Sequence, residues 1–237
     1  MTPVVLTFAV AFLSSVTQIV TGFGFAVVMM ALLPLFLPYD TALCLSILCG
    51  CILSLWLVVK YRRQLQWKKA VLPAVFSILG SLVGLLLDAG GGSRRLLGVF
   101  LVLLALWFLL FAKRVQVPGT LPVGAAVGVV AGVCNALFAM CGPPMVLYYV
   151  SVIREKEAYI STLNLALAGA SVFTLALRAA MVGWPAGLEG SLLPCAAAMV
   201  TGAWVGKLVF DRVDAQQMKR IIYIFMCVVG VYFAIAG

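Results

Sequence analysis

The sequence predicts an all-α integral membrane protein, a polytopic helical bundle of two inverted repeats. Three observations predict this class: the composition, the length of the uncharged stretches, and a series of motifs that occurs twice in the same order. Hydrophobic residues make up 65% of the 237 residues and charged residues only 10%. A soluble domain is about half apolar and about a quarter charged. A chain this apolar cannot cover itself with polar surface, so its solvent must be the lipid bilayer.

The charged residues fall in short clusters, and most stretches between them are close to the roughly 20 residues that cross a bilayer core. We expect plain membrane spans at residues 41–60, 69–87, 95–112, 158–182, 190–209 and 216–236.

The net charge of +9 does not indicate a nucleic-acid partner, because of where the basic residues lie. Five of them crowd the single loop at residues 60–69, between two apolar spans. Membrane proteins carry such an excess of Lys and Arg on the cytoplasmic side. The charge therefore predicts membrane topology.

Two apolar stretches, residues 3–38 and 119–153, are too long for one span each. About 35 residues in one helix would extend roughly 52 Å, against a core of roughly 30 Å. The first is interrupted by Thr-Gly-Phe-Gly-Phe at 21–25 and the second by Cys-Gly-Pro-Pro at 141–144. Each predicts a broken or re-entrant pair of short helices that meet at an unwound point. Non-helical backbone survives at membrane depth only inside protein or beside a wet cavity, so we expect function at these breaks.

The two halves, 1–116 and 117–237, share their motifs and are expected to be the two transmembrane repeats, each with a broken pair and three spanning helices. The matching motifs are Gln18-x3-Gly22-x-Gly24 with Asn135-x3-Ala139-x2-Gly142, and Leu72-Pro73 before Gly80-x3-Gly84 with Leu193-Pro194 before Gly202-x3-Gly206.

The basic residues predict that the second repeat is inverted. The loop at 60–69 has five Lys or Arg, whereas its counterpart at 183–189 has none. A parallel repeat would keep the same charge bias in both halves. We therefore expect 60–69, 113–118, 154–157 and 210–216 in the cytoplasm and both termini on the other side. Inverted repeats with broken helices recur in secondary transporters.

The breaks predict an anion site, because a helix N-terminus offers unpaired N–H groups and partial positive charge. At the first break the glycines allow close backbone approach, and Gln18 offers an amide donor. At the second, two prolines remove N–H donors, so we expect an asymmetric site. Ser46 and Asn164 are expected as outer contacts; in packed helices Gln18 and Asn135 could instead bond between helices. The predicted substrate contacts are Thr17, Gln18, Thr21, Gly22, Phe23, Gly24, Phe25, Ser46, Asn135, Phe138, Cys141, Gly142, Pro143, Met145 and Asn164.

Several chemistries find no support in the sequence. It contains no histidine, and no Asp or Glu lies in the middle of a span, so neither a buried proton relay nor a carboxylate-rich cation site is expected. We also expect no metal, no cofactor, no ATP-binding loop and no enzymatic activity. Arg178 is the one cation well inside an apolar segment. Its side chain either extends to the outer interface or guides an anion.

At these motifs the chain resembles the TauE/SafE family of bacterial sulfite and organosulfonate exporters. The residues that carry the resemblance are the 21–25 break followed by Pro34, and Gly128-x3-Gly132 leading to 141–144. The family pattern often has a glycine run at both breaks, whereas this chain has Cys141 and two prolines at the second. The resemblance implies a permease of the bacterial cytoplasmic (inner) membrane for sulfite, sulfoacetate or a related small anion.

Together these features predict a secondary transporter that exports a small anion by alternating access around a midplane site at the two breaks. An interior-negative potential releases about 2.3 kcal/mol per 100 mV for each exported negative charge, so potential-driven uniport needs no proton carrier. The alternative is a channel for anions or small solutes, since broken helices also line channels. Coupling to a proton or sodium, and a homodimeric assembly, remain open at this point.

Overall fold

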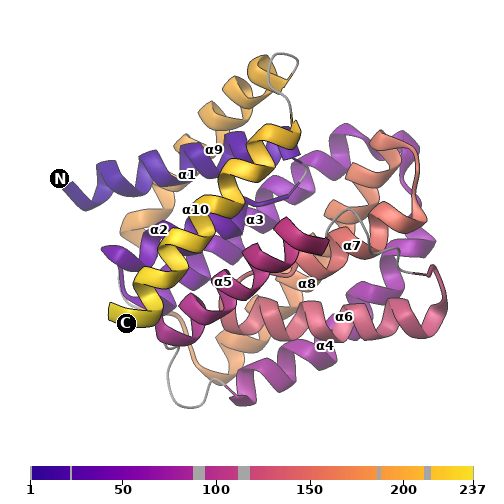
Figure 1. The fold of residues 1–237 in the computed structure, drawn as a ribbon, viewed down its shortest axis with the longest axis horizontal. Helices are drawn as coiled ribbons and strands as arrows, with labels where there is room; N and C mark the ends of the chain where they lie inside the picture. The colour runs from indigo at the N-terminus through magenta and orange to yellow at the C-terminus, as the bar shows by residue number, and fades with distance from the viewer. Residues whose placement is uncertain are drawn as a thin grey trace. The chain divides into compact units, whose positions relative to one another are not determined.

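The computed structural model describes residues 2–21, 23–87, 94–111, 118–185, 188–210 and 215–236. These ranges contain helices and no strand, which confirms the predicted all-α class (Figure 1). The helices are α1 (Thr2–Thr21), α2 (Phe25–Leu32), η1 (Leu33–Leu35), α3 (Tyr39–Lys60), η2 (Arg62–Gln64), α4 (Trp67–Leu87), α5 (Arg94–Phe111), α6 (Leu121–Phe138), α7 (Gly142–Val152), α8 (Lys156–Met181), α9 (Leu188–Phe210) and α10 (Ala215–Ala236).

The predicted plain spans correspond to α3, α4, α5, α8, α9 and α10, and each end agrees to within two residues. Among the described residues, five helical segments are long and apolar enough to cross a membrane: α3, α4, α6, α8 and residues 190–208 of α9. Large apolar side chains on their outer faces are exposed, for example Leu193 at 80% and Leu121 at 75%. Exposed apolar surface of this kind is typical of a face that contacts lipid or another protein, and the length and composition of these helices indicate lipid. The chain is a multi-pass membrane protein.

The chain forms two compact units, each built from both halves of the sequence. Unit 1 comprises Met1–Cys49, Gly91–Lys113 and Pro185–Gly237, and unit 2 comprises Gly50–Gly90 and Arg114–Trp184. The two compact units therefore do not coincide with the two expected repeats, 1–116 and 117–237. The boundary between the repeats stays a prediction.

In unit 2, α4 and α6 run side by side, and glycines bring their backbones together (Figure 1). A Cβ on Gly80 would overlap the Val129 carbonyl, and one on Gly132 would overlap the Ser77 carbonyl. Two further glycines, Gly84 and Gly128, face the partner helix in the same way. Small residues at four-residue spacing permit such approach in membranes, where close van der Waals packing holds helices together.

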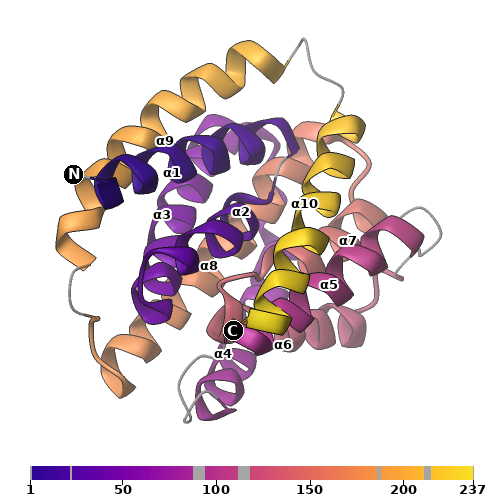
Figure 2. The ribbon, with the colours of Figure 1, turned by 60° about the vertical axis from the view of Figure 1, so that its left-hand side comes forward.

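Unit 1 repeats this arrangement with the roles of the halves exchanged. α9 lies along α1 (Figure 2), where a Cβ on Gly202 would lie 2.7 Å from the Phe12 carbonyl oxygen, and Gly206 faces Ile19. Thus α4 of the first half packs on α6 of the second, and α9 of the second packs on α1 of the first. Such reciprocal pairing is expected of a repeat; the inversion itself stays a prediction.

The pair α6 and α7 is a re-entrant hairpin. The Tyr149 hydroxyl donates to the Lys69 carbonyl at 3.0 Å, and Lys69 Nζ donates to the Val152 carbonyl at 3.5 Å. A Cβ on Gly119 would lie 3.1 Å from Val152. The last turn of α7 therefore lies beside the starts of both α4 and α6. The chain enters through α6 and returns to the same end through α7.

The pair α1 and α2 in unit 1 is re-entrant by the same reasoning. α1 and α9 are parallel, and α10 returns from the end of α9. α5 packs on α10 in the antiparallel direction, since Gly98 faces Ala234 while Gly230 faces Leu101. α5 thus starts where α1 starts, and Arg94 Nη2 donates to the carbonyl of Leu37, just beyond η1, at 3.5 Å.

One expectation about the breaks is wrong: the first helix of each pair is not short. α1 has 20 residues and α6 has 18, whereas α2 has 8 and α7 has 11. The break in each pair comes after a helix of nearly full membrane-spanning length, so only the returning helix is short.

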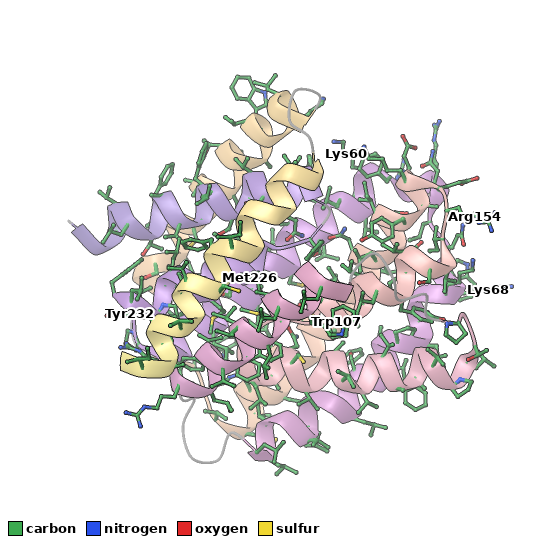
Figure 3. The ribbon with its side chains drawn as sticks, in the orientation of Figure 1. Lys60, Lys68, Trp107, Arg154, Met226 and Tyr232 are labelled. Carbon is green, nitrogen blue, oxygen red and sulfur yellow. The ribbon has the colours of Figure 1, made fainter. Side chains whose placement is uncertain are left out.

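Basic side chains gather at the open end of the α6–α7 hairpin. Lys68 and Arg154 lie at the same end of unit 2 (Figure 3). The loops 60–69 and 154–157, both expected in the cytoplasm, thus share one end of this unit. Most of the other two segments, 113–118 and 210–216, lies outside the described residues.

Candidate functional site

The first break lies between α1 and α2 in unit 1. Gly24 has φ 106° and ψ −4°, a left-handed conformation in which glycine avoids the strain of a side chain. The Phe25 N–H, first in α2, donates to Gln18 Oε1 at 3.2 Å. Phe23 and Phe25 are buried. Gly22 lies outside the described residues, and so does the side chain of Thr21.

Gln18 therefore has a role that the sequence did not predict, beside the amide donor expected of its Nε2, which stays a prediction. Its carbonyl oxygen caps α2 and takes up the first of the N–H groups that were expected to face an anion. An amide in this position satisfies a donor that the helix leaves open at its start. Thr17, the residue before Gln18, is also buried, with 2% of its surface exposed.

The second break lies between α6 and α7 in unit 2 and begins two residues earlier than the sequence indicates. Ala139 adopts a left-handed conformation with φ 59°. Its N–H donates to the Asn135 carbonyl at 2.9 Å, and the Met140 N–H donates to the Cys134 carbonyl at 3.2 Å. The bond from Ala139, in its left-handed conformation, closes the end of α6 as the 5→1 bond of an αL cap does. Pro143 stands in the first turn of α7, as predicted.

The non-helical residues of the second break, 139–141, are enclosed by protein. Phe138, Ala139, Met140 and Cys141 are each at most 6% exposed. This burial fits the requirement that irregular backbone at membrane depth be covered.

Asn135 belongs to a buried polar network that joins three helices of unit 2. Its Nδ2 donates to Thr174 Oγ1 on α8 at 2.8 Å, and Ser81 Oγ on α4 lies 2.8 Å from the same oxygen. Thr174 Oγ1 in turn donates to the Ala170 carbonyl at 2.8 Å. Asn135 Oδ1 is buried and has no hydrogen-bond partner among the described residues.

Arg178 does not extend to the membrane surface, although the sequence left that arrangement open. Its side chain is 2% exposed, and Nη1 donates to the Ala136 carbonyl at 3.2 Å. Ala136 lies in the last turn of α6, where backbone carbonyls carry partial negative charge and attract a cation. Unit 2 thus holds an arginine inside the protein, beside its break.

Thiols surround the start of α7. Cys141 lies near Ser171, Cys134 and Cys51. Cys51 Sγ also donates to the Ala168 carbonyl at 3.8 Å. No group of three metal-binding side chains occurs among the described residues. These cysteines behave as small, hydrogen-bonded packing residues.

The two expected outer contacts bond within their own helices. Ser46 Oγ donates to the Ala42 carbonyl at 2.6 Å, and Asn164 Nδ2 donates to the Ile160 carbonyl at 2.8 Å. Both side chains are fully buried, as is Met145 of α7.

The predicted contacts divide between the units. Unit 2 contains those of the second break and Asn164, and unit 1 contains those of the first break and Ser46. Sequence reasoning missed Ser81, Ser171 and Thr174. Thr174 precedes Arg178 by one helical turn, so a polar stripe on α8 was the available signal.

Comparisons of the chain with curated proteins and with solved structures gave no match. A comparison with protein-family models matches residues 7–233 to the family described as sulfite exporter TauE/SafE. The match includes both breaks and nearly the whole chain. The chain therefore belongs to the sulfite exporter TauE/SafE family and is a multi-pass membrane transporter of small anions.

Proposed function

We propose that this chain exports sulfite or an organosulfonate such as sulfoacetate from the cytoplasm. The anion binds at groups of the two breaks, and the protein works by alternating access. The family match over residues 7–233 is the observation that carries this proposal. The family consists of transporters, so the proposal includes no enzymatic activity.

Two features near the second break support an anionic cargo. Arg178 brings a full positive charge into unit 2, at 2% exposure. In the sequence, Asp and Glu occur near helix ends and not at mid-span. A buried arginine is costly in a membrane protein and usually marks an ion or substrate path. An anion that neutralises this charge offsets part of that cost.

We further propose the bacterial cytoplasmic membrane as the location, with the basic end of unit 2 toward the cytoplasm. The loops 60–69 and 154–157 support this orientation through the excess of Lys and Arg on cytoplasmic loops. The termini then lie on the opposite side. A homodimer is compatible with the broad apolar surface.

Sulfite flux from proteoliposomes at set membrane potentials tests the mechanism. Uniport predicts flux that saturates with sulfite and grows with the potential, by a driving force of about 2.3 kcal/mol per charge per 100 mV. Flux that ignores the potential but follows an imposed pH gradient would contradict uniport. A rate that never saturates would favour a channel.

A further inference from the structure

The orientation of the Asn135 amide follows from the hydrogen bonds of Thr174. The Thr174 hydroxyl proton is donated to the Ala170 carbonyl, so Oγ1 presents only lone pairs to α6. The group 2.8 Å away must be a donor, and in Asn135 that is Nδ2. The carbonyl end of the amide, Oδ1, is the part of Asn135 that the described protein does not use.

An unused acceptor at this depth is unusual. Asn135 is 1% exposed, and the great majority of buried polar atoms in proteins have a hydrogen-bond partner. A buried acceptor without a partner costs about 1–3 kcal/mol. The amide thus favours a ligand that brings a hydrogen-bond donor.

A positive charge lies next to this acceptor along α6. Thr174 and Arg178 are one turn apart on α8, and they bind Asn135 and Ala136, which are consecutive on α6. One face of α8 therefore fixes both an amide carbonyl and a guanidinium at the last turn before the break. The matching ligand has a negative charge for the guanidinium and a donor for Oδ1.

Small sulfur anions divide into two groups by this criterion. The sulfite and sulfoacetate dianions have only acceptors. Hydrogen sulfite carries a proton, and hydroxyalkanesulfonates carry a hydroxyl. We propose that Asn135 makes the transporter selective for sulfur anions that carry their own hydrogen-bond donor, an inference that rests on the proposed function. On this basis hydrogen sulfite and hydroxyalkanesulfonates are preferred over sulfoacetate.

Competition between two matched sulfonates tests this selectivity. Radiolabelled sulfite flux through the full chain in proteoliposomes is inhibited with 2-hydroxyethanesulfonate or with ethanesulfonate, which have the same charge and differ by one hydroxyl. We expect the hydroxylated anion to inhibit at about tenfold lower concentration, because it alone pairs the buried acceptor. Equal inhibition, or inhibition by neither, overturns the inference while sulfite flux itself persists. Absence of sulfite flux contradicts the proposed function instead.

Two variants assign the selectivity to the amide. Asn135→Leu should reduce the tenfold ratio to about one, because no acceptor remains to be paired. Thr201→Val is the control: Thr201 lies exposed on α9 and bonds its own helix at the Ala197 carbonyl, 2.9 Å away. It should keep the ratio of the unmodified protein. If Asn135→Leu keeps it too, the amide is not the selecting group. If that variant does not fold, the ratio in the unmodified protein still decides the inference.

Discussion

The two breaks place an amide side chain at corresponding positions and use its opposite ends. At the first break, Gln18 accepts from the Phe25 N–H with its carbonyl, so the bond stays inside the α1–α2 hairpin. At the second, Asn135 donates from its nitrogen to Thr174, so the bond leaves the hairpin and ties it to α8. The bond that Gln18 accepts is thus local to the first hairpin, and the bond that Asn135 donates links the second hairpin to a neighbouring helix.

Matching positions in the two halves of the sequence therefore need not have equivalent roles. A hydrogen bond within a hairpin is kept when the hairpin moves as a body. A hairpin bonded to α8 must keep those bonds or exchange them when it moves against that helix. The second break, with Arg178 bonded to Ala136 as well, is the one whose polar groups would respond to a ligand.

Substitutions at the glycines where helices pack closely, Gly132 on α6 and Gly206 on α9, are expected to change stability most. Gly132→Ala would press a methyl group onto the Ser77 carbonyl, whereas Gly206→Ala would meet the Ile19 Cβ at 3.0 Å. Overpacking costs about 1–3 kcal/mol, and rigid backbone gives the upper end or more. We expect Gly132→Ala to lower the free energy of unfolding by about 3 kcal/mol and Gly206→Ala by about 1 kcal/mol, measured by denaturant titration in detergent.

Gly190→Ala is the matched control for this pair. It lies in α9, and a Cβ there would meet no atom within 4 Å. Alanine is the better helix former by about 0.5–1 kcal/mol, so this variant should be as stable as the parent or more so. If Gly132→Ala and Gly206→Ala lowered the free energy of unfolding equally, a contact with backbone would be no less tolerant of a methyl group than a contact with a side chain.

The next largest difference is expected when each amide, Gln18 or Asn135, is replaced with the corresponding carboxylate. Gln18→Glu keeps an acceptor for the Phe25 N–H at a helix start, where negative charge is favourable. Asn135→Asp replaces the donor to Thr174 with an oxygen and buries a charge, at a cost of about 3 kcal/mol. We expect a marked fall in the thermal midpoint for Asn135→Asp only. Sulfite flux should fall in both, because each adds negative charge at a break.

Retained stability in Asn135→Asp would mean that its nitrogen does not hold the hairpin to α8. A loss of stability in Gln18→Glu would mean that the first hairpin depends on the amide nitrogen of Gln18 as well. Either result would remove the contrast between the two breaks.

Much of the fold could be predicted from the sequence, because length and polarity determine where a helix can cross lipid. The plain spans agree to within two residues for this reason, and Pro143 signals the start of α7. The turn at Ala139 could not be predicted, since alanine gives no signal for a left-handed conformation. Its φ of 59° is imposed by the bonds that close α6.

The candidate site was only partly predictable, because the sequence does not specify whether an amide side chain forms its hydrogen bond through its oxygen or through its nitrogen. Gln18 and Asn135 were both expected as donors, and the acceptor role of Gln18 toward the Phe25 N–H was not foreseen. The network partners Ser81 and Thr174 come from helices far apart in the sequence. Only tertiary packing brings them to Asn135.

Variants of Arg178 test whether charge distinguishes the second break. Arg178→Gln removes the cation but leaves a donor for the Ala136 carbonyl, and Arg178→Lys keeps the cation with a smaller donor set. We expect Arg178→Gln to raise the sulfite concentration for half-maximal flux about tenfold or more, since hydrogen bonds to charged groups contribute about 1.5–3 kcal/mol. Arg178→Lys should recover part of this. Equal losses in both variants, with a lower thermal midpoint, would assign Arg178 a structural role only.

The smallest effects concern the two left-handed residues, which should respond in opposite directions. Gly24 has φ 106° and Ala139 has φ 59°. Gly24→Ala places a side chain in a strained conformation at a cost of about 1–3 kcal/mol, whereas Ala139→Gly relieves such strain. The relief is partly offset by about 0.4–1 kcal/mol, because glycine gives the unfolded chain more freedom. We therefore expect the thermal midpoint to fall clearly for Gly24→Ala and to rise slightly or stay level for Ala139→Gly. A clear fall in both would mean that the Ala139 methyl group contributes more through its buried packing than its conformation costs. In that case the second break would depend on side-chain contacts where the first depends on glycine.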